Sequence, residues 1–400
     1  MRRLLLCLLV AGVGTVGFAR GAAAYPQFQF SSGTNKCSQC HFSPAGTGLI
    51  SSWGRSESGD TISMAGDGGF LHGAVTLPSW LALGADIRFA GVRNDDGGQA
   101  APQSAWFPMQ ADLYSRFAFS DAFSLYLEGG VRGETRPSSG FANTGIGNIN
   151  YDFSTVADRF ITREHYLMWR PSATGPYARV GRFFAPYGLR FVEHVYFVRR
   201  FTGYNLYEET YTASGGYVGD DWELHLSAFT PPPSSFPDPL QSVGSRESGG
   251  AAYYEKRFIG ESPVVGAVAV QARIGVASEE ARYQGGVIGK AWVEPAKLLF
   301  LGEADLIRQQ VTAASFGQDQ FVSYSGLSWF PIRGLMASLA YERFQENMSV
   351  STTGRNAYDL QINVFPYAHC EAVLLGRLMT VGQASQPASN LLMLQLHYYL

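Results

Sequence analysis

The sequence has few charged residues, few cysteines and almost no long apolar runs. Only 16% of its 400 residues are charged, well below the roughly 25% of ordinary soluble domains. The only long apolar run lies at the N-terminus, which excludes a bundle of membrane-spanning helices. Glycine (46 residues) and aromatic residues (14%) are plentiful, which argues against disorder and against a soluble helical enzyme. What remains is an all-β protein, with a membrane as its candidate environment.

The N-terminal residues have the features of a secretory signal peptide. Two arginines precede the apolar stretch 4–16, and three alanines precede Tyr25. An anchored helix is the weaker interpretation, because this stretch is too short to span a bilayer. We therefore expect residues 1–24 to be removed on export. Without the three arginines of this segment the chain has 27 basic and 33 acidic residues, and its net charge of −6 predicts no nucleic-acid partner.

From residue 80 onward, apolar and polar residues alternate with a period of two, as in strands with two different faces. Ile87 and Phe89, for example, alternate with Asp86 and Arg88. The C-terminus predicts a final strand with one face toward lipid. That face carries Leu392, Leu394, Leu396, Tyr398 and Leu400.

About 16 such segments follow one another, and 14 or 18 strands remain open as alternatives. They start near residues 80, 106, 121, 159, 176, 211, 222, 249, 263, 281, 297, 319, 333, 356, 368 and 389. Tight connections are expected at 120–121, 219–221, 260–262, 294–296, 331–332 and 366–367. Long connections are expected at 94–105, 134–158, 185–210, 231–248, 310–318, 346–355 and 381–388, whereas the link near Glu279 is short and breaks the rule.

This alternation of short and long connections is typical of bacterial outer-membrane barrels with both termini in the periplasm. A soluble β-sandwich would explain the alternating residues. It would not explain the two-sided difference in loop length, nor the polar residues on the inner face. Residues 80–400 are therefore predicted to form a transmembrane antiparallel β-barrel.

One motif carries recognisable chemistry. Cys37, Cys40 and His41 form a C-x-x-C-H motif, the attachment signature of c-type haem. The two thiols bond to the haem vinyl groups, and the imidazole is the proximal ligand of the iron. A disulfide between the two cysteines would not need His41, a thioredoxin-like motif would need a βαβ setting, and a zinc site would need further ligands. The motif predicts one covalent haem c.

The distal iron ligand is less well defined by the sequence. Met64 and His72 are the candidates within the N-terminal segment, and methionine would give a higher reduction potential than a second histidine. His165, His194 or an open coordination position are the alternatives. Residues 25–79 are too few for an independent core. The lumen of a barrel of this size can hold them, so we expect a haem-bearing segment that plugs or caps the pore.

Other polar residues have two interpretations each. The stretch 181–190 and the charged residues after it either fold inward as a constriction or form an ordinary solvated loop, and the second interpretation is favoured. Carboxylates in the long loops either attract cations such as ferrous iron or are simply solvated, and the second interpretation is favoured. They include Asp95, Asp96, Asp152, Asp158, Glu208 and Glu209. Cys370 is expected to be an inert strand residue.

The order of signal peptide, single haem motif and barrel resembles the fused monohaem cytochrome–porin family of outer membranes. Residues 25–33 keep the Pro-x-Phe and the Gly that precede the haem motif in the iron oxidases of that family, but lack the Ala-Arg-Gln after the Phe. Residues 43–55 look like those of a related branch. Only Cys37, Cys40 and His41 are matched residue by residue.

This resemblance implies an electron-transfer cytochrome of the outer membrane, with extracellular iron oxidation as a candidate activity. Its partners would be membrane lipid, an extracellular donor or acceptor such as ferrous iron, and a periplasmic c-type cytochrome or another soluble electron carrier. The alternative is a solute-conducting porin whose haem segment is a redox-sensing gate. A third interpretation is a plain porin in which the motif is accidental.

Overall fold

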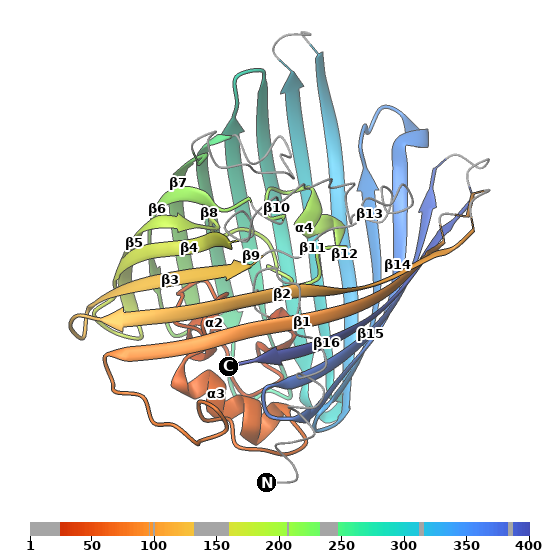
Figure 1. The fold of residues 1–400 in the computed structure, drawn as a ribbon. Coiled ribbons are helices and arrows are strands. Elements are labelled where there is room, and N and C mark those ends of the chain that lie inside the picture. Colours follow the sequence, from red (N-terminus) through yellow and green to blue (C-terminus); the bar gives the residue numbers. More distant parts are fainter. Residues whose placement is uncertain are drawn as a thin grey trace.

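The computed structural model describes residues 25–95, 97–98, 101–131, 160–205, 208–232, 247–311, 316–382 and 387–400. The predicted signal peptide lies outside the described residues. Within them, sixteen antiparallel strands close into one barrel in which each strand pairs with its neighbours in sequence and β16 pairs with β1 (Figure 1). The strands are β1 (Leu81–Asp95), β2 (Gln103–Ala118), β3 (Phe123–Val131), β4 (Phe160–Trp169), β5 (Gly175–Phe183), β6 (Thr210–Val218), β7 (Trp222–Thr230), β8 (Ser248–Phe258), β9 (Val264–Val276), β10 (Glu280–Val293), β11 (Leu298–Val311), β12 (Phe316–Ile332), β13 (Leu335–Gln345), β14 (Gly354–Tyr367), β15 (Cys370–Val381) and β16 (Ser389–Tyr399).

The predicted segments coincide with these strands. Every predicted start lies within three residues of an observed one, and the strand count of 16 is confirmed, so 14 and 18 are wrong. The link between β9 and β10, residues 277–279, is as short as expected. We call the end with the tight connections the short-turn end and the opposite one the long-loop end.

Two of the predicted turns are displaced by two residues. The prolines at 331 and 366 were expected in the turns, but β12 continues to Ile332 and β14 to Tyr367. In both strands the pairing register shifts across the proline, between Trp329 and Ile332 and between Val364 and Tyr367. Proline has no N–H for the ladder, so it interrupts the pairing without ending the strand.

The outer and inner faces of the barrel differ as predicted. Ile87 and Phe89 are exposed on the outside, whereas Asp86 and Arg88 are buried and form an ion pair at 3.0 Å. Outward-facing apolar side chains also include Leu113, Leu167, Val268, Leu306, Leu339, Leu360 and Leu392. An outer surface of this kind fits contact with lipid.

The last residue of the chain was assigned to the wrong side. Leu392 and Leu394 point outward as expected, but Leu400 is only 8% exposed. Its backbone N–H donates to the Ala85 carbonyl, beyond the end of β16. This bond continues the pairing of β16 with β1 by one residue, but the Leu400 side chain is buried and lines a cavity in the barrel.

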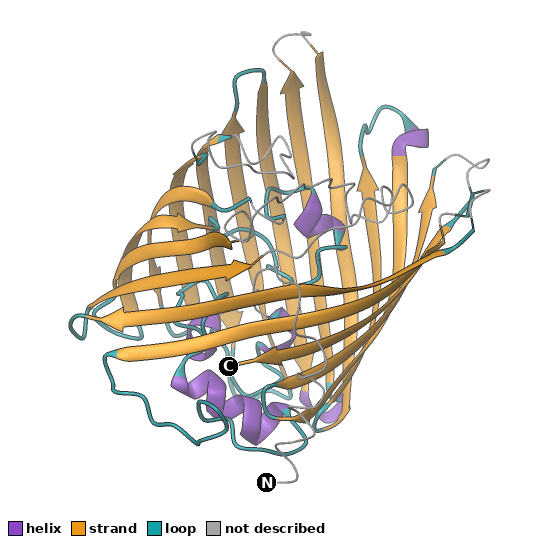
Figure 2. Cartoon of the chain, viewed as in Figure 1, coloured by secondary structure: helices purple, strands orange, loops and turns teal. Residues whose placement is uncertain are grey.

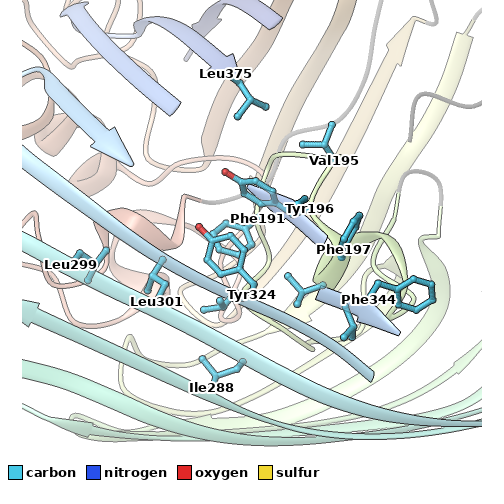
Figure 3. Packing of buried hydrophobic residues seen from close by; sticks show 14 of the residues in the cluster. Phe191, Val195, Tyr196, Phe197, Ile288, Leu299, Leu301, Tyr324, Phe344 and Leu375 are labelled. Carbon is cyan, nitrogen blue, oxygen red and sulfur yellow. The ribbon is translucent and has the colours of Figure 1, made fainter. Parts of the chain in front are cut away.

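The lumen contains a large apolar core (Figure 3). The connection between β5 and β6, which includes α4 (Phe197–Arg200), folds inward and packs against β11, β12 and β13. Its residues Phe191 and Tyr196 contact Tyr324 of β12 at ring-centroid distances of 4.5 and 5.1 Å. The inward constriction is confirmed and the solvated loop is wrong. We call residues 184–205 and 208–209 the lumen loop.

This core explains why β11 alternates poorly in the sequence. Leu299, Leu301, Glu303 and Asp305 all face inward and are buried, whereas Leu306 is exposed outside. The apolar pair packs in the core with the lumen loop. Glu303 and Asp305 face the lumen loop too, and Glu303 accepts a hydrogen bond from the Leu189 N–H of that loop at 2.8 Å.

Residues 25–80 form short helices joined by loops at the short-turn end (Figure 2). The helices are η1 (Pro26–Phe28), α2 (Cys37–Cys40), α3 (Ser52–Glu57) and η2 (Ser58–Ile62). We call residues 25–80 the N-terminal segment. Its Phe30 belongs to the same apolar cluster as the lumen loop, so the two pack together inside the barrel. None of the described helices is long and apolar enough to cross a bilayer.

Candidate cofactor site

The cysteine motif forms a single helical turn. Cys37 and Cys40 are the first and last residues of α2, so both thiols lie on one short, rigid element. The side-chain oxygen of Gln39 accepts the backbone N–H groups of Asn35 (3.0 Å) and Lys36 (3.1 Å). It thereby satisfies donors that a helix start leaves without a partner. The two cysteines are free thiols, and burial raises the pKa of both, that of Cys40 to about 12.

His41 follows the helix directly, and its ring is fixed by one hydrogen bond. Nδ1 donates to the Gly48 carbonyl at 3.2 Å. Because a carbonyl only accepts, the proton is on Nδ1 and the lone pair on Nε2. Burial lowers the His41 pKa to about 4, which keeps the ring neutral near pH 7. A neutral histidine whose second nitrogen donates to a backbone carbonyl is the usual arrangement of a metal-ligating imidazole.

Gly48 is suited to this position by its backbone. Its φ of +65° lies in the left-handed region, and a Cβ there would collide with the Tyr126 hydroxyl. Gly54 of α3 is equally restricted, since a Cβ would collide with the backbone of Cys40. The motif is therefore held between a tight loop on one side and a closely packed helix on the other.

All three motif residues line one cavity. The N-terminal segment forms one wall with residues such as Phe28 and Ile50, and the barrel and the lumen loop form the rest. Barrel-side lining residues include Asp86, Arg88, Tyr114, Leu189, Arg190, Lys290, Phe365, His397 and Leu400.

The loop after the motif is anchored in the barrel wall. Leu49 is 1% exposed and packs in a cluster with Tyr114, Tyr126, Tyr166 and Phe183. Its backbone N–H donates to the Tyr126 hydroxyl at 3.3 Å. These contacts position the carbonyl that holds His41, because Gly48 directly precedes Leu49.

Polar contacts fasten the rest of the segment. Lys36 pairs with Asp220 in the turn between β6 and β7 at 2.7 Å. Deeper in the lumen, Gln29 donates to Glu255 at 2.9 Å and accepts from Lys290 at 2.7 Å. The charged inner faces of the strands thus act as binding surfaces for the N-terminal segment.

The two candidate distal ligands lie elsewhere. Neither Met64 nor His72 is among the residues that line the cavity. Met64 is half-exposed, and its N–H donates to the Phe365 carbonyl at 2.8 Å. The ring of His72 contacts those of Tyr367 and His369. The structure thus does not bring these two candidates together with Cys37, Cys40 and His41, and the distal ligand stays a prediction.

Of the barrel histidines named from the sequence, neither His165 nor His194 lines the cavity, whereas His397 of β16 does. Its Nδ1 and Nε2 lie 2.7 Å from Glu371 and 3.0 Å from Asp86. Sequence reasoning missed this residue as part of the site. In the period-two pattern His397 alternates with the outward-facing leucines, which places it on the inner face. Only the fold shows that Glu371, Asp86 and the cavity lie beside it.

Two of the six loop carboxylates have a different role from the one favoured by the sequence. Glu208 and Glu209 are buried, so they are not solvated loop charges. Glu209 forms an ion pair with Arg163 of β4, and Glu208 accepts the Asn205 N–H at 2.8 Å. The Asp95 carboxylate accepts the Gly97 N–H at 3.0 Å. Asp96, Asp152 and Asp158 lie outside the described residues.

The comparisons with known proteins show the fold. No protein-family profile matches the sequence, and no curated protein matches it. The barrel is similar to OprB of Pseudomonas putida (TM-score 0.58, 9% identity, 85% of this chain and 99% of that one). It is also similar to outer-membrane expressed OmpT of Vibrio cholerae (0.56, 10%, 82% and 100%) and to an anion-selective porin from Comamonas acidovorans (0.53, 9%, 80% and 99%). The chain thus has the closed-barrel architecture of outer-membrane porins.

Proposed function

We propose that this chain is an outer-membrane barrel that holds one covalent haem c in the cavity at its short-turn end and passes electrons across the membrane. The observation that carries the proposal is the placement of Cys37, Cys40 and His41 on one wall of the same cavity. The apolar outer face of the barrel and its similarity to outer-membrane porins support the location.

The residues present fit a haem. Cys37 and Cys40 would form the two thioether bonds, and His41 would offer Nε2 to the iron because its Nδ1 is bound to Gly48. Bound there, the haem would supply one-electron iron chemistry. Leu49 and the aromatic cluster around it hold the motif loop in place. Phe28, Ile50 and Leu189 give the cavity apolar walls.

The packed lumen favours electron transfer over free diffusion of solutes. The apolar cluster joins Phe30 of the N-terminal segment and the lumen loop to inner-face residues of β8 through β16 and of β1. Water and solutes are excluded from such a core. An electron needs no open pore, so a filled lumen is compatible with a conduit.

In this proposal the N-terminal segment lies on the periplasmic side, where a soluble c-type cytochrome or another carrier exchanges electrons with the haem. The donor or acceptor is outside the cell, with ferrous iron as one candidate. The activity would then be that of an extracellular iron oxidase.

The second candidate function is a solute-conducting porin in which the N-terminal segment is a redox-sensing gate. The comparisons favour this function, since the similar structures are described as porins, channels or outer-membrane proteins and none of them supports electron transfer. In that case the lumen loop and the N-terminal segment would have to move aside for solutes.

Two measurements on the purified protein separate these functions. Covalent haem is measured on denaturing gels by haem staining, with Cys37→Ala/Cys40→Ala as the control. Conductance in planar bilayers is then recorded with the haem oxidised and reduced. The conduit predicts stained wild type, unstained control and low conductance in both redox states. Conductance that follows the redox state would support the gate, and absence of covalent haem would refute both.

A further inference from the structure

We propose that Arg190 of the lumen loop binds a carboxylate of the cofactor, namely a haem propionate. The inference rests on the proposed haem and adds an anchor that the cysteine motif does not supply. It would link the cofactor directly to the loop that fills the lumen.

Arg190 occupies an unusual position for its residue type. It is only 5% exposed and lines the same cavity as Cys37, Cys40 and His41. Its φ of +58° lies in the left-handed region, which is strained for a residue other than glycine. Contacts of the surrounding loop offset this strain and hold the side chain at the cavity: Gly188 and Leu189 donate their N–H groups to Gln271 (2.6 Å) and Glu303 (2.8 Å).

The charges of the cavity single out this arginine. Each of the other lysine and arginine side chains that line it is neutralised by a carboxylate: Arg88 by Asp86 (3.0 Å), Lys290 by Glu255 (2.6 Å) and Lys36 by Asp220 (2.7 Å). No carboxylate of the described residues lies within 4.0 Å of the Arg190 guanidinium. Its contacts are the Ala45 carbonyl, to which Nη1 donates, and the ring of Tyr253, 4.9 Å from Cζ.

A buried guanidinium that no carboxylate contacts directly is costly. A planar carboxylate is its best partner, because two parallel N–H groups can donate to the two oxygens. Haem c carries two such groups as propionates, and its thioether bonds already place it in this cavity. One propionate on Arg190 would neutralise the cation.

The contact to Ala45 gives the anchor a second consequence. Ala45 belongs to the loop that begins at the motif and ends at Leu49, whereas Arg190 belongs to the lumen loop. The arginine thus touches both parts that would enclose the cofactor. Loading of the haem would fix the lumen loop and the N-terminal segment to each other.

The test compares Arg190→Gln, Arg190→Lys and Arg199→Gln. Arg199 is a matched control, because it is buried in the same loop and donates to the Tyr204 carbonyl at 3.2 Å but does not line the cavity. Haem content, midpoint potential and the propionate bands in resonance Raman spectra are measured on each purified, folded protein, after a gel sample of it has stained for covalent haem.

Removal of a positive charge beside the haem stabilises the ferric state. R190Q is therefore expected to lower the midpoint potential and shift the propionate band, R190K to shift the band with little change in potential, and R199Q to change neither. Unchanged bands and potential in R190Q would overturn the proposal, as would equal shifts in R199Q. If R190Q does not fold, an unchanged propionate band in R190K overturns it.

A failure of this proposal can be distinguished from a failure of the proposed function. Wild-type protein without covalent haem would refute the function itself. Wild-type protein with haem whose spectra do not respond to R190Q would refute only the anchor.

Discussion

Docking of the N-terminal segment depends on Leu49, and its truncation gives the sharpest structural prediction. Leu49 is 1% exposed and enclosed by aromatic side chains of the barrel wall. Leu49→Ala removes buried methyl groups and leaves a cavity, which costs about 2.7–5.0 kcal/mol. The cost falls on the docked state alone, because the barrel closes through its own strand pairs.

At about 1.36 kcal/mol per tenfold change, the population of the undocked state should increase roughly 10²- to 5 × 10³-fold. Cleavage by trypsin after Arg55 measures this population, since Arg55 is buried in the docked segment and cleavage follows the open form when opening is fast. The fragment is quantified by mass spectrometry, so that cleavage in the long loops does not interfere.

Leu71→Ala is the matched control, because Leu71 lies in the same segment and is 40% exposed. Trypsin should cleave the L71A variant after Arg55 at the wild-type rate. A heat-shift gel confirms that the barrel of each variant is folded. Equal cleavage rates for L49A, L71A and wild type would refute the claim that the barrel wall holds the segment through this side chain.

Further predictions concern the same docking equilibrium. Tyr126→Phe leaves the buried Leu49 N–H without its partner, which costs about 1–3 kcal/mol and should speed cleavage after Arg55 about 5- to 150-fold; no increase would show that the bond contributes nothing. Gly48→Ala should also speed cleavage, because alanine is strained at a φ of +65° and collides with the Tyr126 hydroxyl. The double variant G48A/Y126F should cost less than the sum of the two, since the hydroxyl is then absent; strict additivity in the same assay would contradict a collision between these two groups. Asp220→Asn removes an exposed ion pair with Lys36 and should leave the cleavage rate unchanged. A large increase in the cleavage rate would show that this ion pair is the main contact that holds the N-terminal segment.

The barrel could be predicted from the sequence because its signal is local. A strand that faces lipid on one side and a polar lumen on the other alternates with period two, and the pattern holds in β1, β3 and β16. The short motif is also a local signal, since two thiols and an imidazole at this spacing have few alternative uses, but the haem that it predicts stays a prediction.

What the sequence did not predict depends on contacts between distant parts. The lumen loop contains several charged residues and looks solvated, but Phe191 and Tyr196 bury it against β12. Glu209 resembles a loop charge until the fold brings Arg163 to it. Arg190 and His397 line the cavity because separate strands and loops converge there on the cysteine motif. The period-two pattern of the sequence contains no information on that convergence.

The central claim is a transmembrane electron path through the haem motif, and vesicles test it directly. Purified, folded protein, of which a gel sample stains for covalent haem, is reconstituted into liposomes that enclose a redox dye. Ferrous iron or another reductant that cannot cross membranes is added outside. The account predicts that the dye is reduced with wild-type protein and not with Cys37→Ala/Cys40→Ala. An unreduced dye, despite a normal covalent haem spectrum and added soluble cytochrome, would contradict it.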